Sequence, residues 1–312
     1  MRHIRIASRA SKLALAQVNI IKEALEKLSD DIEISIVEIS TKGDRDKSNF
    51  LYKSESVGFF TSEVEKALSD GRADLAVHSL KDLPTADTPG LVVAAIPKRE
   101  AVADALVASG PAASIKDLPA GATVGTSSLR RIAQLCRFRN DLKCVPLRGN
   151  VETRVRKVTE GEVDAAIVAC AGLNRLGLAD KISSVLAPEQ FITAPGQGAL
   201  AVQVRAEDTE LIEFVCQLDD KPTRIATEAE RLVLASMQGG CSIPLGVYAR
   251  IAEEQLEIDA MIADIKGEKY VRRSKTTCLE VVKSCARELA NELLEAGGRE
   301  ILQQLRGRRN DL

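Results

Sequence analysis

The chain has 312 residues, of which 45% are hydrophobic and 28% charged, and its formal net charge is −2. A domain usually holds ~100–200 residues, so this length predicts two or three domains. The composition excludes disordered and collagen-like proteins, and no apolar run approaches the ~20 residues that cross a bilayer, so we expect no membrane segment.

The N-terminus and the cysteines predict a reducing compartment. Residues 1–6 carry charge inside the first apolar run and lack the apolar core and the cleavage site of an export signal. The seven cysteines show no CxxC spacing, and only two histidines could join them as metal ligands. We therefore predict a cytoplasmic protein with neither a metal site nor a disulfide scaffold.

The first third of the chain begins with a strand, a helix and a second strand. Residues 4–7 predict a strand, and the turn at 8–11 leads into a helix with a broad apolar face. Residues 32–39 alternate as a half-buried strand, whereas residues 43–58 are polar, lack periodicity and predict a mobile loop. A helix near 60–69 and a strand at 75–77 follow.

The middle third repeats this order. Residues 124–128 resemble the first strand-to-helix turn, and residues 161–175 resemble the segment from 71 to 82. The repetition predicts two related α/β units whose largely parallel sheets are covered on both faces. Residues 97–104 and 194–198 look like two crossings between the units, and two crossings would form a hinge.

The last third changes to an α+β pattern. A helix at 223–237 stops at Gly239 and Gly240, and strands near 245–251, 255–263 and 269–277 precede a final helix from about 279. We assign residues 1–98 and 197–217 to domain 1, residues 103–193 to domain 2 and residues 221–312 to domain 3.

Three strand-to-helix turns combine Ser or Asn with Arg, at 8–11, 127–131 and 148–151. Free amides at a helix start, hydroxyls and a guanidinium together can hold a carboxylate, although each Ser or Asn alone is more often a helix cap. Residues 130–157 contain nine basic residues against two acidic ones. This excess favours small multi-carboxylate ligands over nucleic acid, because Phe138 is the only aromatic residue in that window.

Asp82 and Cys241 are the candidates for chemistry. Asp82 lies just past an apolar strand, where open α/β sheets bind ligands, and beside Lys81 its carboxylate should stay ionised and stabilise a developing cation. A cap or a simple partner of Lys81 is the alternative, and His78 is either part of this site or a core residue. Cys241 stands on a loop between Gly240 and Pro244, with no histidine near in sequence, so a covalent attachment point competes with a Cys/His pair.

Seven phrases spread over the whole chain together resemble the porphobilinogen deaminase family. They are RIASRASKLAL (5–15), ADLAVHSLKDLP (73–84), VGTSSLRRIAQL (124–135), LRGNVETR (147–154), AGLNRLGL (171–178), APGQGALAV (194–202) and GGCSIPLG (239–246). The resemblance implies two α/β domains like periplasmic binding proteins with a hinge and a cleft, plus a smaller α+β C-terminal domain. It also implies a monomeric transferase of porphyrin and heme biosynthesis, which joins four porphobilinogen molecules head to tail, releases ammonia and gives the linear tetrapyrrole hydroxymethylbilane.

The resemblance further implies roles for individual residues. Cys241 would hold a dipyrromethane cofactor through a thioether, and the catalytic Asp82 would contact pyrrole N–H groups and stabilise the cationic azafulvene formed as ammonia leaves. The other cofactor-binding residues would be Lys81, Ser127, Ser128, Arg130, Arg131, Arg148 and Asn150. The substrate-binding residues would be Arg9, Ser11, Lys53, Phe60, Arg148, Arg154, Arg175 and Gln197.

Two positions depart from the family pattern. Val57 stands where the family commonly has a loop lysine, and Ala101-Val102-Ala103 replaces Asp-Pro-Arg, which removes an arginine near the hinge. We expect both changes to affect substrate affinity or hinge behaviour. The alternative function is a non-catalytic anion-binding protein of the periplasmic class, which would share the two-lobed fold, need neither Asp82 nor Cys241, and carry an export signal.

Overall fold

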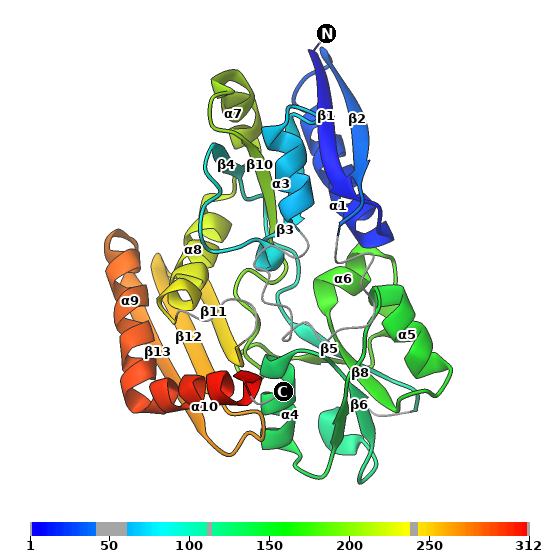
Figure 1. Ribbon diagram of the computed structural model, residues 1–312, viewed down its shortest axis with the longest axis vertical. Coiled ribbons are helices and arrows are strands. Elements are labelled where there is room, and N and C mark those ends of the chain that lie inside the picture. Colours follow the sequence, from blue (N-terminus) through cyan, green and yellow to red (C-terminus); the bar gives the residue numbers. More distant parts are fainter. Residues whose placement is uncertain (1, 42–60, 111–113, 238–242, 311–312) are drawn as a thin grey trace.

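The computed structural model describes residues 2–41, 61–110, 114–237 and 243–310. Figure 1 shows three parts, each built on its own sheet: the first at the top, the second at the lower right and the third at the lower left. Four residues singled out in the sequence, Lys53, Val57, Phe60 and Cys241, lie outside the described residues.

The first sheet has the strand order β2-β1-β3-β10-β4. β1 runs parallel to β2 and β3, whereas β10 runs antiparallel to β3 and β4. Four of the five strands run in one direction, as the prediction of a largely parallel sheet requires; the exception is β10, which enters from the second crossing and runs back between β3 and β4. Its elements are β1 (Arg2–Arg9), α1 (Lys12–Glu26), β2 (Ile32–Ile39), α3 (Ser62–Ser69), β3 (Leu75–Ser79), η2 (Leu80–Asp82), β4 (Leu91–Ala95), β10 (Leu200–Arg205), α7 (Thr209–Val215) and η5 (Cys216–Leu218).

The second sheet repeats this plan with the order β7-β6-β8-β5-β9. β6 runs parallel to β7 and β8, and β5 runs antiparallel to β8 and β9, just as β10 does in the first sheet. The matching orders and directions confirm two related α/β units. The elements are β5 (Asp104–Ala108), η3 (Ile115–Asp117), β6 (Thr123–Gly125), α4 (Leu129–Phe138), β7 (Lys143–Val145), α5 (Val151–Thr159), β8 (Ala165–Ala169), α6 (Cys170–Arg175), η4 (Ala179–Lys181) and β9 (Ser184–Leu186).

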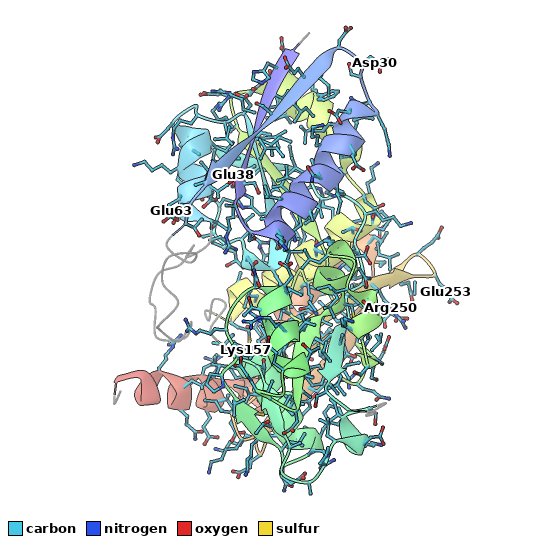
Figure 2. All side chains as sticks on the ribbon, turned by 90° about the vertical axis from the view of Figure 1, so that its right-hand side faces the viewer. Asp30, Glu38, Glu63, Lys157, Arg250 and Glu253 are labelled. Carbon is cyan, nitrogen blue, oxygen red and sulfur yellow. The ribbon has the colours of Figure 1, made fainter. Side chains whose placement is uncertain are left out.

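The third part is an antiparallel three-stranded sheet packed against helices. Its core includes Val233 from α8, Ile258 from β12 and Leu289 from α9. The β11–β12 hairpin ends at Glu253, which projects away from the body of the molecule (Figure 2). The elements are α8 (Lys221–Ser236), β11 (Leu245–Ala252), β12 (Gln255–Ala263), β13 (Tyr270–Cys278), η7 (Leu279–Val281), α9 (Val282–Leu293), η8 (Leu294–Gly298) and α10 (Arg299–Asn310).

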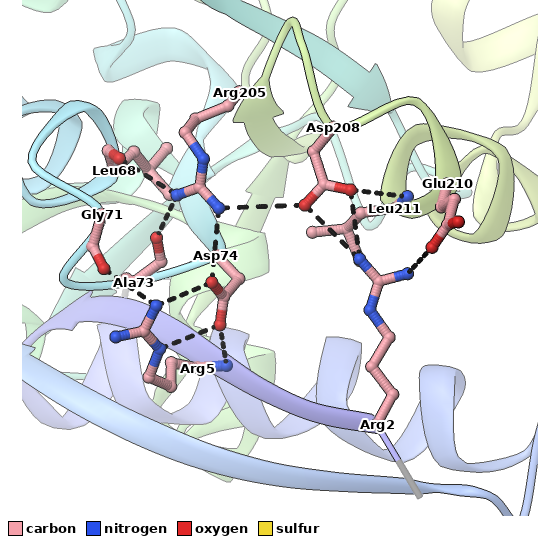
Figure 3. Close-up of polar contacts among 10 residues, drawn as sticks. All are labelled: Arg2, Arg5, Leu68, Gly71, Ala73, Asp74, Arg205, Asp208, Glu210 and Leu211. Atoms are coloured by element: carbon pink, nitrogen blue, oxygen red, sulfur yellow. Dashed lines mark hydrogen bonds and ion pairs between the residues drawn. The ribbon is translucent and has the colours of Figure 1, made fainter.

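An ionic network ties β10 into the first sheet (Figure 3). Asp74, in the turn before β3, accepts hydrogen bonds from the Arg5 backbone N–H at 2.9 Å and from its Nη2 at 2.8 Å. Arg205, at the end of β10, reaches Asp74 at 3.4 Å and donates to the Ala73 carbonyl at 2.7 Å. Residues far apart in sequence are thereby held at one end of the sheet.

Two chain segments connect the first sheet to the second, 96–103 from β4 to β5 and 187–199 from β9 to β10. They touch each other where the Glu100 N–H donates to the Gly198 carbonyl at 3.3 Å. Gly198 has a φ of +88°, and a Cβ there would lie 2.5 Å from the Glu100 carbonyl oxygen. Only glycine therefore allows the two connections to approach this closely.

Gly198→Ala tests this close approach, with Gly161→Ala as its matched control. Gly161 has a similar φ of +75°, but a Cβ there would meet no atom within 4 Å. We expect the control to lose about 1 kcal/mol of unfolding free energy from backbone strain, and Gly198→Ala to lose about 3 kcal/mol or more. Equal losses in urea denaturation would show that the contact between the two connections contributes nothing.

Candidate active site

Asp82 lies in the short turn η2, at the carboxyl end of β3. Leu80 is buried and anchors the turn, while Lys81 and Asp82 are half-buried. Arg231 of α8 donates to the carbonyls of Leu83 at 2.8 Å and Pro84 at 2.6 Å. A helix of the third part thus holds the turn that carries Asp82, which the sequence did not predict.

Asp104 is fully buried at the start of β5, where the first crossing enters the second sheet. Its Oδ2 accepts from Arg130 Nη1 at 2.8 Å, and its Oδ1 accepts from Arg131 Nη2 at 2.7 Å and from Gln197 Nε2 at 3.0 Å. Burial raises the pKa of Asp104, but the two guanidiniums outweigh burial and hold that pKa below its usual range. Asp104 therefore joins α4 to both crossings as a carboxylate.

Glu230 is a second buried carboxylate, and it connects the crossings to the third part of the molecule. It is fully buried on α8 and forms a bidentate ion pair with Arg99 of the first crossing, at 2.8 and 2.9 Å. It also accepts from the backbone N–H of Gly196 in the second crossing at 2.6 Å and from that of Ala249 in β11 at 2.8 Å. One carboxylate thus connects both crossings to the third part.

Positive charge exceeds negative charge around Asp82. Burial lowers the pKa of Lys81 to about 8, with Asp82 opposing the shift and Arg131 adding to it. Burial also lowers the pKa of Arg154 to about 10, again with Arg131 adding and Asp82 opposing. The coupled cations among the described residues are Lys81, Arg130, Arg131, Arg148 and Arg154, against the carboxylates of Asp82 and Asp104. Five cations and two carboxylates leave a surplus of three positive charges, which suits an anionic ligand.

The predicted Ser and Asn residues act mainly on their own backbone. Ser11 Oγ accepts from the Ala14 N–H at 3.3 Å and Asn150 Oδ1 accepts from the Thr153 N–H at 2.8 Å, so both are helix caps. Ser127 Oγ donates to the Leu147 carbonyl at 3.1 Å, and Ser128 precedes α4 without a side-chain cap bond. The cap alternative therefore applies to two of the three turns.

The predicted arginines lie around the same region, and Arg9 ends β1 at the edge where β3 also ends. Arg154 Nε donates to the Gly149 carbonyl at 2.9 Å, and Arg175 Nη2 donates to the Gly198 carbonyl at 2.6 Å. Lys81 and Arg154 are electrostatically coupled to Asp82 from opposite units. The structure thus brings Lys81 and Asp82 of the first unit close to Arg154 of the second, near the carboxyl ends of parallel strands.

His78 belongs to the core. It is buried, and its Nε2 lies 3.1 Å from Gln203 Oε1, while Gln203 Nε2 donates to Glu65 at 3.0 Å. Burial lowers the pKa of His78, which favours the neutral ring. The core alternative stated for this residue is therefore the one that the structure supports.

Asp104, Glu230 and Arg231 were missed in the sequence. Asp104 precedes an apolar strand, and Glu230 falls among the buried positions of α8, next to Ala229 and three residues before Val233. A carboxylate on an apolar face is a detectable signal, because a buried charge needs a partner. Arg231 gave no comparable signal, since its carbonyl partners are 147 to 151 residues away in sequence.

Comparison with known proteins agrees with this arrangement. A family model described as porphobilinogen deaminase, dipyromethane cofactor binding domain, matches residues 4–213, and one for the C-terminal domain of the same family matches residues 224–295. The porphobilinogen deaminase of Maridesulfovibrio salexigens is 46% identical over 98% of this chain and 99% of its own length. That of Nitratidesulfovibrio vulgaris strain Hildenborough is 44% identical over 98% of this chain and 97% of its own.

Among solved structures, a Salmonella typhimurium periplasmic binding protein with high arginine specificity aligns with 72% of this chain and 94% of its own, at a TM-score of 0.39 and 12% identity. No helix in the described part of the chain is long and apolar enough to cross a membrane. The same described residues contain no group of three or more His, Cys, Asp or Glu side chains placed to hold a metal ion.

The described residues fit a ligand that carries carboxylates and N–H groups, as a dipyrromethane does. Buried polar atoms without a hydrogen-bond partner among the described residues include Arg130 Nε, Thr193 Oγ1 and Gln197 Oε1. The first can donate to a carboxylate, and the last can accept from a pyrrole N–H. With the surplus positive charge, these atoms form a donor and acceptor set of the required kind.

Asp104→Asn tests the buried carboxylate, with Asp141→Asn as control, since Asp141 also pairs with an arginine but is exposed. Removing the charge leaves two buried guanidiniums without compensation, so we expect a loss of about 3–5 kcal/mol of unfolding free energy, against little change in the control.

The pH dependence gives a second readout for Asp104→Asn. The folded-state pKa of Asp104 is depressed. Its stabilisation is therefore fully present above the unfolded pKa, near ~4, and is lost as pH falls through the folded value. The stability gap between wild type and Asp104→Asn should narrow below about pH 4 in denaturation series. A gap that widens there would contradict the assignment.

Proposed function

The chain belongs to the porphobilinogen deaminase family, and from this premise we propose that the cluster around Asp82 is the site where it acts on porphobilinogen. The family is one of tetrapyrrole-building enzymes. The match includes the C-terminal domain, which a non-catalytic protein of the periplasmic class would not need, so that alternative is not supported. The observation that carries the proposal is the surplus of positive charge beside Asp82.

The surplus charge assigns the carboxylate-binding role. Arg130 and Arg131 already donate to Asp104, so they supply mainly a fixed positive field. We propose that Lys81, Arg148 and Arg154 bind the acetate and propionate groups of porphobilinogen and of the growing chain. Further proposed contacts are Arg9, Ser11, Lys53, Phe60, Ser127, Ser128, Asn150, Arg175 and Gln197. Each added pyrrole brings carboxylates, which is why a cleft with excess positive charge suits elongation.

Asp82 is proposed as the catalytic residue. Loss of ammonia from porphobilinogen leaves positive charge on the pyrrole, and a carboxylate fixed before the reaction stabilises that charge without reorganising. Arg231 fixes the turn from one side, through three backbone carbonyls at 2.6 to 3.3 Å.

We propose that Cys241 holds the dipyrromethane through a thioether. When bound, this group supplies the primer to which porphobilinogen units are added. Two features support the attachment: the family model of the first 213 residues is one that binds this cofactor, and α8 ends at Ser236, five residues before Cys241.

We further propose that the protein works as a cytoplasmic monomer. Cys136, Cys144, Cys170, Cys216, Cys278 and Cys285 are free thiols in the described part of the chain, as in proteins of reducing compartments. Each domain also contributes to one site within a single chain, so the proposed chemistry requires no second copy.

Asp82→Asn should lower the rate of porphobilinogen consumption by about 10²–10³-fold while leaving the melting temperature unchanged. Asp87→Asn is the matched control, because Asp87 is exposed five residues further along the same segment. Normal turnover by Asp82→Asn, measured by ammonia release, would exclude the cation-stabilising role.

Cys241→Ser tests the attachment residue. Intact-protein mass spectrometry should show a dipyrromethane-sized increment on the wild type and none on the variant. Cys216→Ser is the control, since Cys216 is an exposed thiol of the described residues, and it should keep the increment. An increment that persists in Cys241→Ser would place the attachment elsewhere.

A further inference from the structure

A pocket lies where the second and third parts of the molecule meet. Its volume is about 600 Å³, which is in the range that small-molecule ligands occupy. It is formed by the end of α4, the segment before Phe191 and the start of β13. None of the residues proposed for the cleft lines it; the lining residues are Gln134, Arg137, Phe138, Glu189, Gln190, Tyr270 and Arg272.

One cation in this pocket is not balanced by a carboxylate of the described residues. Arg272 forms an ion pair with Asp259, and Glu189 lies 3.5 Å from Arg250, which is labelled in Figure 2. Arg137, in contrast, has no ion pair or hydrogen bond to any described side chain or backbone group, and its guanidinium lies 4.2 Å from the centre of the Tyr270 ring. Arg250 also pairs with Glu257 at 2.7 Å, so Glu189 adds a negative charge to the pocket wall. What the pocket presents is one guanidinium without an ion-pair partner, that of Arg137, against an aromatic ring.

An exposed aromatic ring lines the same pocket. Phe138 is the last residue of α4, directly after Arg137, and it is 45% exposed. Its ring stacks on the buried Phe191 with centroids 6.1 Å apart and an interplanar angle of 22°. A guanidinium next to an accessible ring recognises a planar aromatic ligand that carries a carboxylate.

The walls of the pocket are held in place before any ligand binds. Gln134 donates to the Ile192 carbonyl at 3.0 Å and accepts from the Ile192 N–H at 2.8 Å. The β12–β13 turn packs so closely on α4 that a Cβ on Gly267 would lie 2.6 Å from the Ala133 carbonyl and 2.7 Å from the Arg137 nitrogen. A preformed pocket costs little ordering free energy on binding.

We propose that this pocket is a second ligand site, outside the cleft, for a planar aromatic carboxylate. The carboxylate pairs with Arg137, and the ring lies against Phe138. The inference rests on the pocket alone and does not depend on the function proposed for Asp82 or Cys241.

The same contacts connect the site to the cleft. Phe191, on which Phe138 stacks, lies 5.9 Å from the Arg130 guanidinium, and Arg130 pairs with Asp104. Gln134 also contacts Ile192, whose carbonyl accepts from Arg130 at 2.8 Å. Two side chains, Phe138 and Phe191, thus lie between a ligand in the pocket and the buried ion pairs that hold the two crossings.

Fluorine NMR can detect binding at this site directly. The chain has three tyrosines, so full-length protein labelled with 3-fluorotyrosine gives few resonances, and Tyr270→Phe identifies the one inside the pocket. Titration with naphthalene-2,6-dicarboxylate should shift the Tyr270 resonance saturably, and neutral naphthalene should bind at least about tenfold more weakly.

Two variants and one control complete the test. Arg137→Ala and Phe138→Ala should each weaken binding of the dicarboxylate about tenfold. Arg156→Ala is the control, because this exposed arginine of the same domain pairs with Glu160 on α5 and should leave the affinity unchanged. A Tyr270 resonance that does not shift saturably, or equal affinity in wild type and both pocket variants, would overturn the proposal. Because the resonance reports the pocket itself, these outcomes are independent of whether turnover depends on Asp82.

Discussion

Two buried carboxylates, Asp104 and Glu230, determine how the three parts of this molecule are held together. Glu230, in the third part, accepts hydrogen bonds from Arg99 of the first crossing and from Gly196 of the second. Asp104, in the second part, accepts from Arg130 of α4 and from Gln197 of the second crossing. Carboxylates so fully buried are stable only with matched guanidiniums, which Arg99, Arg130 and Arg131 supply. The two crossings are therefore held to the second part by Asp104 and to the third part by Glu230.

The same arrangement gives the cleft its charge. The arginines of α4 are drawn inward by Asp104, and they add a positive field to that of Lys81 and Arg154. Asp82 is held in this field by a helix of the third part. A site that joins carboxylated pyrroles needs both features, a cationic surface for the side chains and one fixed carboxylate for the reacting ring. Domain 3 would thus contribute to the proposed active site through Arg231 as well as through the proposed cofactor cysteine.

Local patterns in the sequence predicted most elements of the fold. Periodicity located β2 and the three strands of the third part to within about a residue, and the repeated turns indicated two related units. The mixed direction of both sheets could not be predicted, because β5 and β10 are placed by long-range pairing with β8 and β3 and not by any property of their own residues. Strand direction is a property of the whole chain path.

The sequence supplied candidate residues for the site but not their contacts. The turns rich in Ser, Asn and Arg do meet, yet Ser11 and Asn150 cap their helices and Arg130 and Arg131 serve a buried carboxylate. Residues 101–103 depart from the family pattern in sequence. The Val102 carbonyl nevertheless accepts a hydrogen bond from the Gln197 side chain, so the backbone of this segment takes part in the contact between the two crossings. Partners some 30 to 150 residues apart, such as Arg131 with Asp104 or Arg231 with Leu80, are visible only after folding.

We expect the carboxylates of bound pyrroles to neutralise the positive charge around Asp82. The pKa of Lys81 measures that neutralisation directly. Carbon-13 NMR of labelled lysine, assigned with Lys81→Arg, can follow this pKa in the wild type and in Cys241→Ser. The pKa of Lys81 should be about 8 in Cys241→Ser, which lacks the primer. It should be higher by about one unit or more in the wild type, because the added anions favour the ammonium form. The same pKa of Lys81 in both proteins would show that the pyrrole carboxylates do not neutralise this charge.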